Sequence, residues 1–290
     1  MADFLSAYSI QNWLESCPQG YLEGTQWGHG ADEREPGLLI DNEVLRQDAI
    51  RTTVQLVVGE RCALAASSGL INAADEESSK HFLATQTLDE ARHVEIFTHR
   101  LYDLGVRKED LESTITRYVN PNLVKFAEIL LEKVDRKDFV AGVVGQNIVL
   151  EGMAFSVFEM MHAMNREMNP TFAHTLSGTI ADERRHVGFG ENCIASLIKK
   201  YPEKLPEVER MQRDMSYFML AAFADAFRNT EGFDEMGRLG LERSHETYQG
   251  ADLGTMAPAE MEHLLADTVL KEFKTRLGRI GIEYQTPTAP

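Results

Sequence analysis

The sequence predicts an all-α protein whose core is a four-helix bundle, with additional helices and an irregular N-terminal arm. Two observations predict this class. Several long stretches repeat their apolar residues with the period of an α-helix and are bounded by glycine or proline. In addition, one unit, a glutamate followed by a Glu-x-x-His motif, occurs twice along the chain.

A single domain over residues 1–290 is the expected organisation, because nothing in the composition divides a chain of this length. Residues 1–40 would form the arm, 41–200 the core helices, and 205–290 additional helices and a tail. Within these regions we expect helices at 41–76, 77–104, 122–134, 138–167, 170–200, 205–229 and 258–278, and a polar, glycine-containing stretch at 230–256.

Glycine and proline mark several of these boundaries. Gly105 should end the second helix, and Pro170 should begin the helix at 170–200. Gly142 and Gly145 lower the helix propensity inside 138–167, which indicates close approach of another helix or a distorted turn. The helix at 122–134 lies between the two half-repeats, so we expect it to be the crossover connection of the bundle.

The repeated unit carries the candidate chemistry. Its second half reads DEARH from Asp89 to His93 in one copy and DERRH from Asp182 to His186 in the other. Its first half is an isolated glutamate in apolar sequence. Residues three apart lie on one face of a helix, so each Glu-x-x-His pair can reach one point. Four such helices would bring together Glu60, Glu90, His93, Glu151, Glu183 and His186.

This set of side chains predicts a site for two metal ions. It is the arrangement of the ferritin-like dimetal proteins, in which two helices give one Glu each and two give Glu-x-x-His. Oxygen-rich ligands with one imidazole per metal suit iron or manganese better than structural zinc. Burying one bare carboxylate costs on the order of 20 kcal/mol in the idealised limit. Two divalent cations would balance the four negative charges.

Glu-x-x-His alone is weak evidence, because the sequence contains it five times. The other copies lack the Asp before the Glu and the Arg before the His, so we interpret them as ordinary surface. They are Glu159/His162, Glu242/His245 and Glu260/His263. For DEARH and DERRH, the alternative is a solvent-exposed stripe of salt bridges. His162 is the nearest rival ligand, but it lies roughly 16 Å along the helix from Glu151, which favours a pocket or core position.

Two aspartates are expected behind the ligands. Asp89 and Asp182 each lie four residues before the histidine of their own motif. A carboxylate there can accept the far ring N–H and fix the metal-binding tautomer. Ordinary surface acids are the alternative.

Residues near the ligands are expected to line a substrate pocket. Phe97 and Phe155 would exclude water, and Thr179 or Gln146 would hydrogen-bond a metal-bound oxygen species, with an ordinary core contact as the alternative for each of these two. Other expected wall residues, one turn from ligands, are Leu56, Leu64, Gln86 and Val187. A cluster of methionines is either adaptable core or the wall of an apolar tunnel: Met153, Met160, Met161, Met164 and Met168.

Composition limits the partners. The formal net charge of −17 argues against nucleic acid or an anionic membrane. Cys17, Cys62 and Cys193 are too few and too scattered for a disulfide framework or a thiolate site, which favours the cytoplasm. We see no leader-like start and no run of about 18 apolar residues, so membrane integration is not expected.

On these motifs the sequence resembles the ferritin-like diiron-carboxylate oxidases and oxygenases over about residues 41–230. The segments NIVLEG, DERRHVGFG and MGRLGLERS look most similar to the ligand-binding oxidases related to the ribonucleotide reductase small subunit. That resemblance implies a diiron or manganese–iron centre held by the six residues above, a bound fatty-acid-like ligand and a homodimer.

Three departures narrow the resemblance. Phe97 stands where the reductase subunit has its radical tyrosine, which argues against a radical-generating subunit. Cys62 and Gln146 stand where the ligand-binding oxidases form a valine–tyrosine crosslink, so that crosslink is not expected. Thr179 stands where the p-aminobenzoate N-oxygenases have a seventh ligand, a histidine.

The function expected from motifs and resemblance is that of a non-haem dimetal oxidase or oxygenase. It would use O₂ to oxidise a C–H or N–H bond of a small organic substrate, with an external electron donor. We expect two iron ions, with a manganese–iron pair as the alternative. Amine N-oxygenation and acyl desaturation are alternatives within this class, and a ferroxidase or iron-handling protein is the alternative from a different class.

Overall fold

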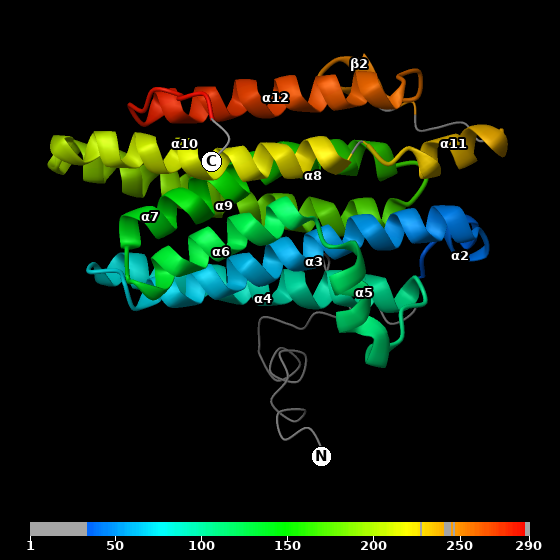
Figure 1. Ribbon diagram of the computed structural model, residues 1–290, viewed down its shortest axis with the longest axis horizontal. Helices are drawn as coiled ribbons and strands as arrows, with labels where there is room; N and C mark the ends of the chain where they lie inside the picture. The colour runs from blue at the N-terminus through cyan, green and yellow to red at the C-terminus, as the bar shows by residue number, and fades with distance from the viewer. Residues whose placement is uncertain (1–33, 227, 241–244, 246, 288–290) are drawn as a thin grey trace.

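Four helices form the central bundle of the molecule (Figure 1). In this computed structural model, which describes residues 34–226, 228–240, 245 and 247–287, they are α3 (Glu43–Ile71), α4 (Glu77–Asp103), α8 (Glu151–Asn165) and α9 (Pro170–Lys200). Helix α3 packs along α4, and α8 packs along α9. The predicted all-α class is confirmed.

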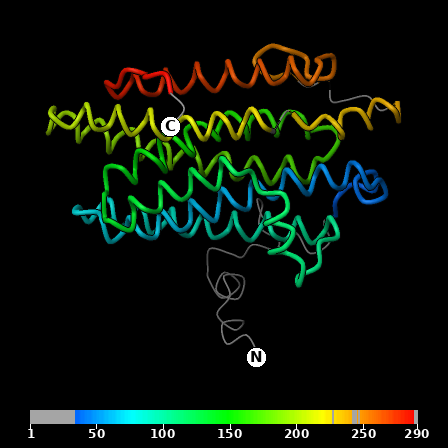
Figure 2. The backbone as a smooth tube through the Cα atoms, viewed as in Figure 1, coloured from blue at the N-terminus to red at the C-terminus, as the bar shows by residue number. Residues whose placement is uncertain are grey.

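The remaining elements lead into this bundle or pack around it. Helix α6 packs against α3 and α10, and α12 packs against α8. Figure 2 follows the chain from the blue α3 and the cyan α4 at one side to the red α12 at the other. The elements are α2 (Gly37–Asp41), α5 (Leu111–Tyr118), α6 (Pro121–Asp135), α7 (Phe139–Val143), η3 (Val144–Leu150), α10 (Leu205–Ala226), α11 (Glu231–Arg238), the antiparallel pair β1 (Thr247–Tyr248) and β2 (Ala251–Asp252), α12 (Pro258–Arg279), and 3₁₀ turns at Lys108–Asp110 and Pro202–Lys204.

The ends of the core helices follow from capping chemistry. The side chain of Asn42 accepts a hydrogen bond from the backbone N–H of Leu45 at the start of α3. Asn169 does the same for Phe172, and Pro170 is the first residue of α9, as predicted. Gly105 takes a φ of +92° just after α4, which ends that helix as predicted.

Residues 139–165 form one helical rod with a distorted middle. The segment η3 has π geometry, with α7 before it and α8 after it. A Cβ atom on Gly142 would lie 2.3 Å from Cδ2 of Leu70, and one on Gly145 would lie 2.7 Å from Cδ1 of Leu130. Both glycines therefore permit close approach of neighbouring helices, and the expected distortion is confirmed in η3.

Several boundaries differ from the prediction. Helix α3 ends at Ile71 rather than near 76, and α10 ends at Ala226 rather than 229. The sequence analysis missed α5 and α11, because eight residues are too few to establish an apolar period, and it missed the β1–β2 pair, whose strands have two residues each. Residues 1–33 of the expected N-terminal arm lie outside the described residues. The last residues of the arm, from Gly37 on, form the start of α2.

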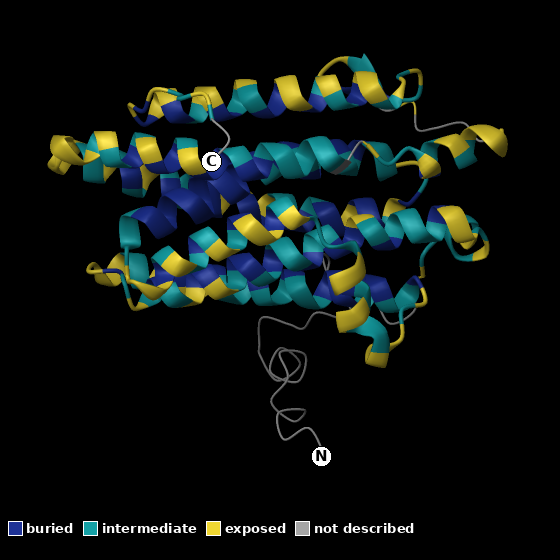
Figure 3. Cartoon of the chain, viewed as in Figure 1, coloured by how far each residue is buried: buried dark blue, intermediate teal, exposed yellow. Residues whose placement is uncertain are grey.

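Burial is concentrated where the central helices face one another. Figure 3 shows η3 as the most continuous buried stretch, and all seven of its residues are buried. By length and composition alone, α3 and the rod at 139–165 are long and apolar enough to cross a membrane, so the expectation that no stretch of the chain would meet this criterion is wrong. Buried core helices pass the same test, and 83% of the apolar window in the rod is buried inside the protein.

Candidate metal centre

Six side chains from four helices meet in the middle of the bundle. All six are at most 5% exposed. Their donor atoms form two groups whose members lie within 4.8 Å of one another, one with Glu60, Glu90, His93 and Glu183 and one with Glu90, Glu151 and His186. The structure therefore brings together every residue that we predicted as a metal ligand.

The two histidines define two halves of this centre. His93 Nδ1 lies 3.3 Å from Oε2 of Glu60 and 3.6 Å from Oε2 of Glu90. His186 Nδ1 lies 3.4 Å from Oε1 of Glu90 and 3.7 Å from Oε1 of Glu151. Glu90 thus offers one oxygen to each half.

Glu183 is shared in the same way. Its Oε1 lies 3.6 Å from His93 Nδ1, and its Oε2 lies 3.6 Å from His186 Nδ1. The two glutamates of the Glu-x-x-His motifs therefore lie where carboxylates could bridge two cations, and Glu60 and Glu151 lie where each could bind one cation.

Burial disfavours the negative charge of the four glutamates at this centre. Burial raises the pKa of Glu60 to about 8 and raises the pKa of Glu151 and of Glu183 as well. Burial alone would also raise the pKa of Glu90, but the imidazolium groups of His93 and His186 lower it to about 2. Without metal, the carboxylates therefore rely on protons and imidazolium ions for neutrality.

A pair of cations fits these residues. Among the described residues, Glu90 Oε2, Glu183 Oε2 and His186 Nδ1 have no hydrogen-bond partner although they are buried. Such orphaned polar atoms are costly unless something binds them. Two divalent ions would satisfy these atoms and balance four carboxylates.

The far nitrogens of the two imidazoles pair across the bundle. His93 Nε2 lies 3.1 Å from Oδ2 of Asp182, and His186 Nε2 lies 3.3 Å from Oδ2 of Asp89. The expected pairing of each aspartate with its own motif histidine is therefore wrong. Because each Nδ1 points into the centre, each Nε2 points towards the opposite helix, where the other motif supplies the aspartate. The two contacts agree with the expected role of fixing the tautomers.

The arginines of both motifs close this side of the centre. Arg185 donates to Asp89 at 3.0 Å and to Asp182 at 2.7 Å. Arg92 donates to Asp89 at 3.2 Å. Burial alone would raise the pKa of Asp182, but its bonds with His93 and Arg185 lower that pKa to about 2. The sequence analysis gave these arginines no role, although their identical position in both motifs was a signal.

Three amides gather at Glu151. Gln86 Nε2 lies 2.6 Å and Gln146 Nε2 lies 2.8 Å from Oε1 of Glu151. Asn147 Nδ2 lies 3.0 Å from Oε2. Gln146 is thus engaged with a carboxylate, and its expected bond to a metal-bound oxygen species stays a prediction. Asn147 was missed, although it stands four residues before Glu151, a spacing that places two side chains on one face of a helix.

The other predicted site residues lie at different distances from the centre. Phe97 is fully buried one turn beyond His93. Thr179 is 2% exposed, and its hydroxyl makes only a long contact of 3.5 Å with Thr175 O, so its role stays a prediction. Phe155 has the guanidinium groups of Arg184 and Arg276 over its ring, at 5.8 and 4.9 Å. Its expected role as a pocket wall also stays a prediction.

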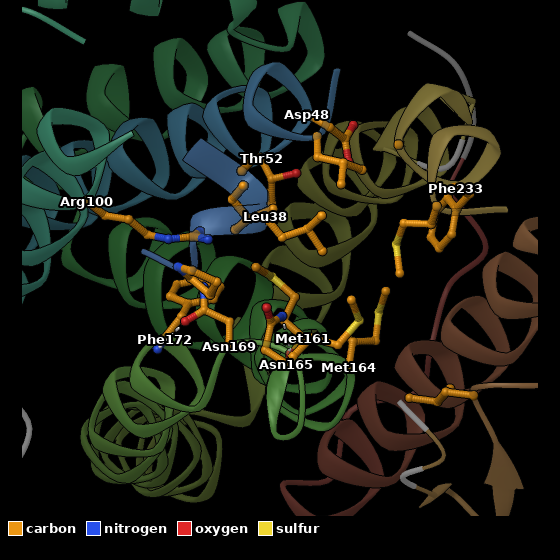
Figure 4. Close-up of a pocket in the computed structure, with 18 of the residues that line it drawn as sticks. Leu38, Asp48, Thr52, Arg100, Met161, Met164, Asn165, Asn169, Phe172 and Phe233 are labelled. Atoms are coloured by element: carbon orange, nitrogen blue, oxygen red, sulfur yellow. Dashed lines mark hydrogen bonds between the residues drawn. The ribbon is translucent and has the colours of Figure 1, made fainter. Parts of the chain in front are cut away.

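A separate pocket of about 220 Å³ lies further along the bundle, and we call it the methionine pocket (Figure 4). Figure 4 shows Arg100 and Phe172 together at one end and Asp48 and Phe233 towards the other. Its wall includes Met161, Met164, Met168, Met236 and Met261. Three of these belong to the predicted cluster, whereas Met153 and Met160 are buried core.

The wall of this pocket begins about two helical turns from the ligands, not one as expected. Arg100, seven residues after His93, is roughly 10 Å along α4. A hollow of about 10 Å³ beside the pocket is lined by Phe97, Arg100, Asp103, Phe172 and Thr175, among others. Of the expected wall residues, only Phe97 lines either of these two spaces. His162 lies in a third, polar pocket with Glu159, Arg166 and Arg184.

Comparison with known proteins agrees with this architecture. No protein-family model matches the chain, and no curated protein matches it. Solved structures of R2-like ligand-binding oxidases do match. One with an aerobically reconstituted Mn/Fe cofactor after a long soak has a TM-score of 0.67 and 15% identity, and the match covers 82% of this chain and 81% of that one.

Two point variants of R2-like ligand-binding oxidase give similar matches. The variant with an anaerobically reconstituted Mn/Fe cofactor has a TM-score of 0.68 and 17% identity, with 83% of this chain and 82% of that chain covered. The other, reconstituted aerobically, has a TM-score of 0.69 and 15% identity, with 84% of each chain covered. Sequence identities this low support a conclusion about the fold alone. The chain has the ferritin-like helical fold of the R2-like ligand-binding oxidases.

Proposed function

We propose that this protein is a non-haem dimetal oxidoreductase that activates O₂ and oxidises a C–H or N–H bond of a small organic substrate. The observation that carries the proposal is the buried centre, where four glutamates and two histidine Nδ1 atoms converge. The fold shared with oxidases that contain a Mn/Fe cofactor supports it. A bound pair of redox-active metals would supply the reduction of O₂ and the oxidising power.

The chain itself would position the metal ligands, supply their negative charge and exclude water from the centre. Glu90 and Glu183, which turn one oxygen towards each histidine, would help to hold both ions. Glu60 and His93 would hold one ion, and Glu151 and His186 would hold the other. Asp182 and Asp89 hold the imidazoles with Nδ1 turned inward. The fully buried Phe97 keeps bulk water from the His93 side.

The methionine pocket favours an organic substrate over iron as the substrate. Its wall is mostly apolar, and methionine side chains adapt to irregular apolar molecules. A small hollow beside Phe97 shares Arg100 and Phe172 with this pocket. A ferroxidase, the alternative from another class, has no need of such a pocket. Amine N-oxygenation and acyl desaturation remain alternatives within the proposed class.

Two iron ions are the first choice for the metals, because the ligand set is rich in oxygen and carries one imidazole per position. The Mn/Fe cofactor of the structural relatives makes a mixed pair the second choice. Metal analysis after loading with equal amounts of Fe(II) and Mn(II) separates these choices.

The decisive test starts from the metal-free protein. Anaerobic loading with Fe(II), followed by O₂, should give absorption and Mössbauer spectra of two coupled irons, with uptake ending near two irons per chain. A substrate should change the decay of the oxygenated protein and give an oxidised product. Turnover of many irons per chain with mineral formation would support a ferroxidase instead. Glu151→Ala should abolish stable two-metal loading, and normal loading in that variant would refute the ligand assignment.

The proposal also includes an external electron donor, a homodimer and a cytoplasmic location. Phe97 at the position of the reductase radical tyrosine argues against a radical-generating subunit. Light scattering of the purified chain tests the dimer. Consumption of a chemical reductant during substrate oxidation tests the need for a donor.

A further inference from the structure

The two halves of the centre differ in the support given to their terminal glutamates. Glu151 accepts hydrogen bonds from the amides of Gln86, Gln146 and Asn147. All three amides are completely buried. In the described part of the chain, no amide donates to Glu60, whose hydrogen-bond partner is His93 at 3.3 Å.

Helix geometry explains part of this difference. Gln55 stands five residues before Glu60, as Gln146 stands five before Glu151. In the regular helix α3, five residues correspond to roughly 140° of rotation, and the Gln55 amide instead donates to the backbone oxygens of Arg51 and Tyr118. In η3, the i to i+5 geometry of a π-helix stacks residue 146 over residue 151.

The other two amides also lack counterparts at Glu60. Asn147 stands four residues before Glu151, and the equivalent residue before Glu60 is Leu56. Gln86 stands four residues before Glu90, and the equivalent residue before Glu183 is Thr179.

The amides form one network that crosses three helical segments. Gln86 and Gln146 also donate to Oε1 of Glu90, at 3.1 and 3.4 Å, and this is the oxygen that faces His186. Asn147 Nδ2 also donates to Gln86 Oε1 at 3.1 Å and to the backbone oxygen of His186 at 3.2 Å. A Cβ atom on Gly190 would lie 2.4 Å from Cβ of Asn147. Helix α9 therefore leaves space for Asn147 only because residue 190 is a glycine.

We infer that Gln86, Gln146 and Asn147 are positioning residues for one metal position, that of Glu151 and His186, and that the position of Glu60 and His93 does without them. The inference rests on the proposed dimetal centre. Three donors fix the orientation of the Glu151 carboxylate and take up part of its charge, whereas the Glu60 carboxylate is held by His93. The two positions are therefore unequal although their ligands are the same in kind.

The test compares amide variants with a matched control in the full-length chain. Asn147→Leu and Gln146→Met remove donors from Glu151, and Gln86→Met repeats the test from another helix. Gln55→Met removes an amide at the same spacing in the other half. Anaerobic Fe(II) titration by calorimetry gives the affinity of each binding step, and Mössbauer spectra of ⁵⁷Fe at one and two equivalents give the environment of each iron.

The amide variants should lose about 10- to 100-fold in affinity at one step. The other step should lose less, because only the shared carboxylates connect it to the amides. Only one of the two iron spectra should change. Gln55→Met should lower the thermal stability of the metal-free protein and leave both steps intact. Equal weakening of both steps, or no change at either in variants that fold, would overturn the inference. Failure of the unaltered protein to take up two irons would instead overturn the proposed function.

Discussion

The two halves of the bundle carry the same ligands on different helices. In the first half, Glu60 lies in the middle of the regular helix α3. In the second half, Glu151 lies at the junction between the π segment η3 and α8. The Glu-x-x-His helices α4 and α9 match more closely, since each supplies a glutamate, a histidine, an aspartate and an arginine in the same order.

Some residues of the site occur in both halves, and others occur in one half only. The shared residues determine that two cations can bind, because each imidazole–aspartate contact, and the bond from each motif arginine to its own aspartate, has a counterpart across the centre. The residues of one half only, above all the amides at Glu151, determine how the two positions differ.

The largest expected effect comes from removing a shared ligand. Glu90 faces both His93 and His186, so Glu90→Gln should weaken both metal-binding steps by more than about 100-fold, beyond the usual loss for a supporting residue. Glu60→Gln, the matched variant, should lose one step and keep the other. Anaerobic Fe(II) titration measures both. Loss of a single step in Glu90→Gln would show that this glutamate does not bridge.

An effect of about 10- to 100-fold is expected at the aspartates. Asp182→Asn should weaken the position of His93, and Asp89→Asn the position of His186, because the contacts cross between the motifs. Mössbauer spectra identify the affected position by comparison with Glu60→Gln and Glu151→Gln. If each aspartate variant instead perturbed the histidine of its own motif, the crossed pairing would be refuted.

The ligands could be predicted from the sequence, whereas their surroundings could not. Glu60 and Glu151 were recognisable because an acid in apolar sequence needs compensation, and the motif repeat fixed the other four. The partners of Asp89 and Asp182 depend on which helix lies opposite and on which ring nitrogen faces inward, and no spacing along one helix contains that information.

The distorted rod at 139–165 could also be predicted only in part from the sequence. Gly142 and Gly145 predicted an irregularity there, and it is present. The glycines alone do not predict π geometry, which places Gln146 over Glu151, and the space for Asn147 depends on Gly190 of the facing helix α9. The methionine pocket was partly foreseen through Met161, Met164 and Met168, but its distance from the ligands depends on how the turns between them are filled.

A smaller, pH-dependent effect should distinguish the metal-free and metal-loaded states. Burial raises the pKa of Glu60 from 4.5 to about 8. Burial opposes protonation of His186, but its bond with Asp89 and the nearby carboxylates raise its pKa from 6.5 to about 11. The folded protein thus binds these protons more tightly than the unfolded chain, and the stability they contribute is lost as the pH rises through these ranges.

The melting temperature of the metal-free protein should therefore fall between about pH 5 and pH 9. Metal binding displaces the same protons, so apparent Fe(II) affinity should rise by up to about tenfold per pH unit for each proton displaced. Anaerobic thermal unfolding with and without metal measures both trends. A metal-free protein whose stability rose over this range would contradict the assignment of protons to Glu60 and His186.

The smallest effect is expected at the arginines. The side chain of Arg185 is 54% exposed, although it contacts both aspartates, and exposed ion pairs contribute about 0–1 kcal/mol. Arg185→Gln should therefore change Fe(II) affinity by less than about fivefold, equally at both steps, and the difference should shrink at high salt. Arg92→Gln is the matched variant, and because the Arg92 side chain is only 22% exposed its effect should be the larger of the two. If Arg185→Gln lowered Fe(II) affinity as much as Asp182→Asn, the orientation of the aspartates would depend on Arg185 more than on the imidazoles. The contacts of Arg185 with both aspartates would then support the ligands of both positions.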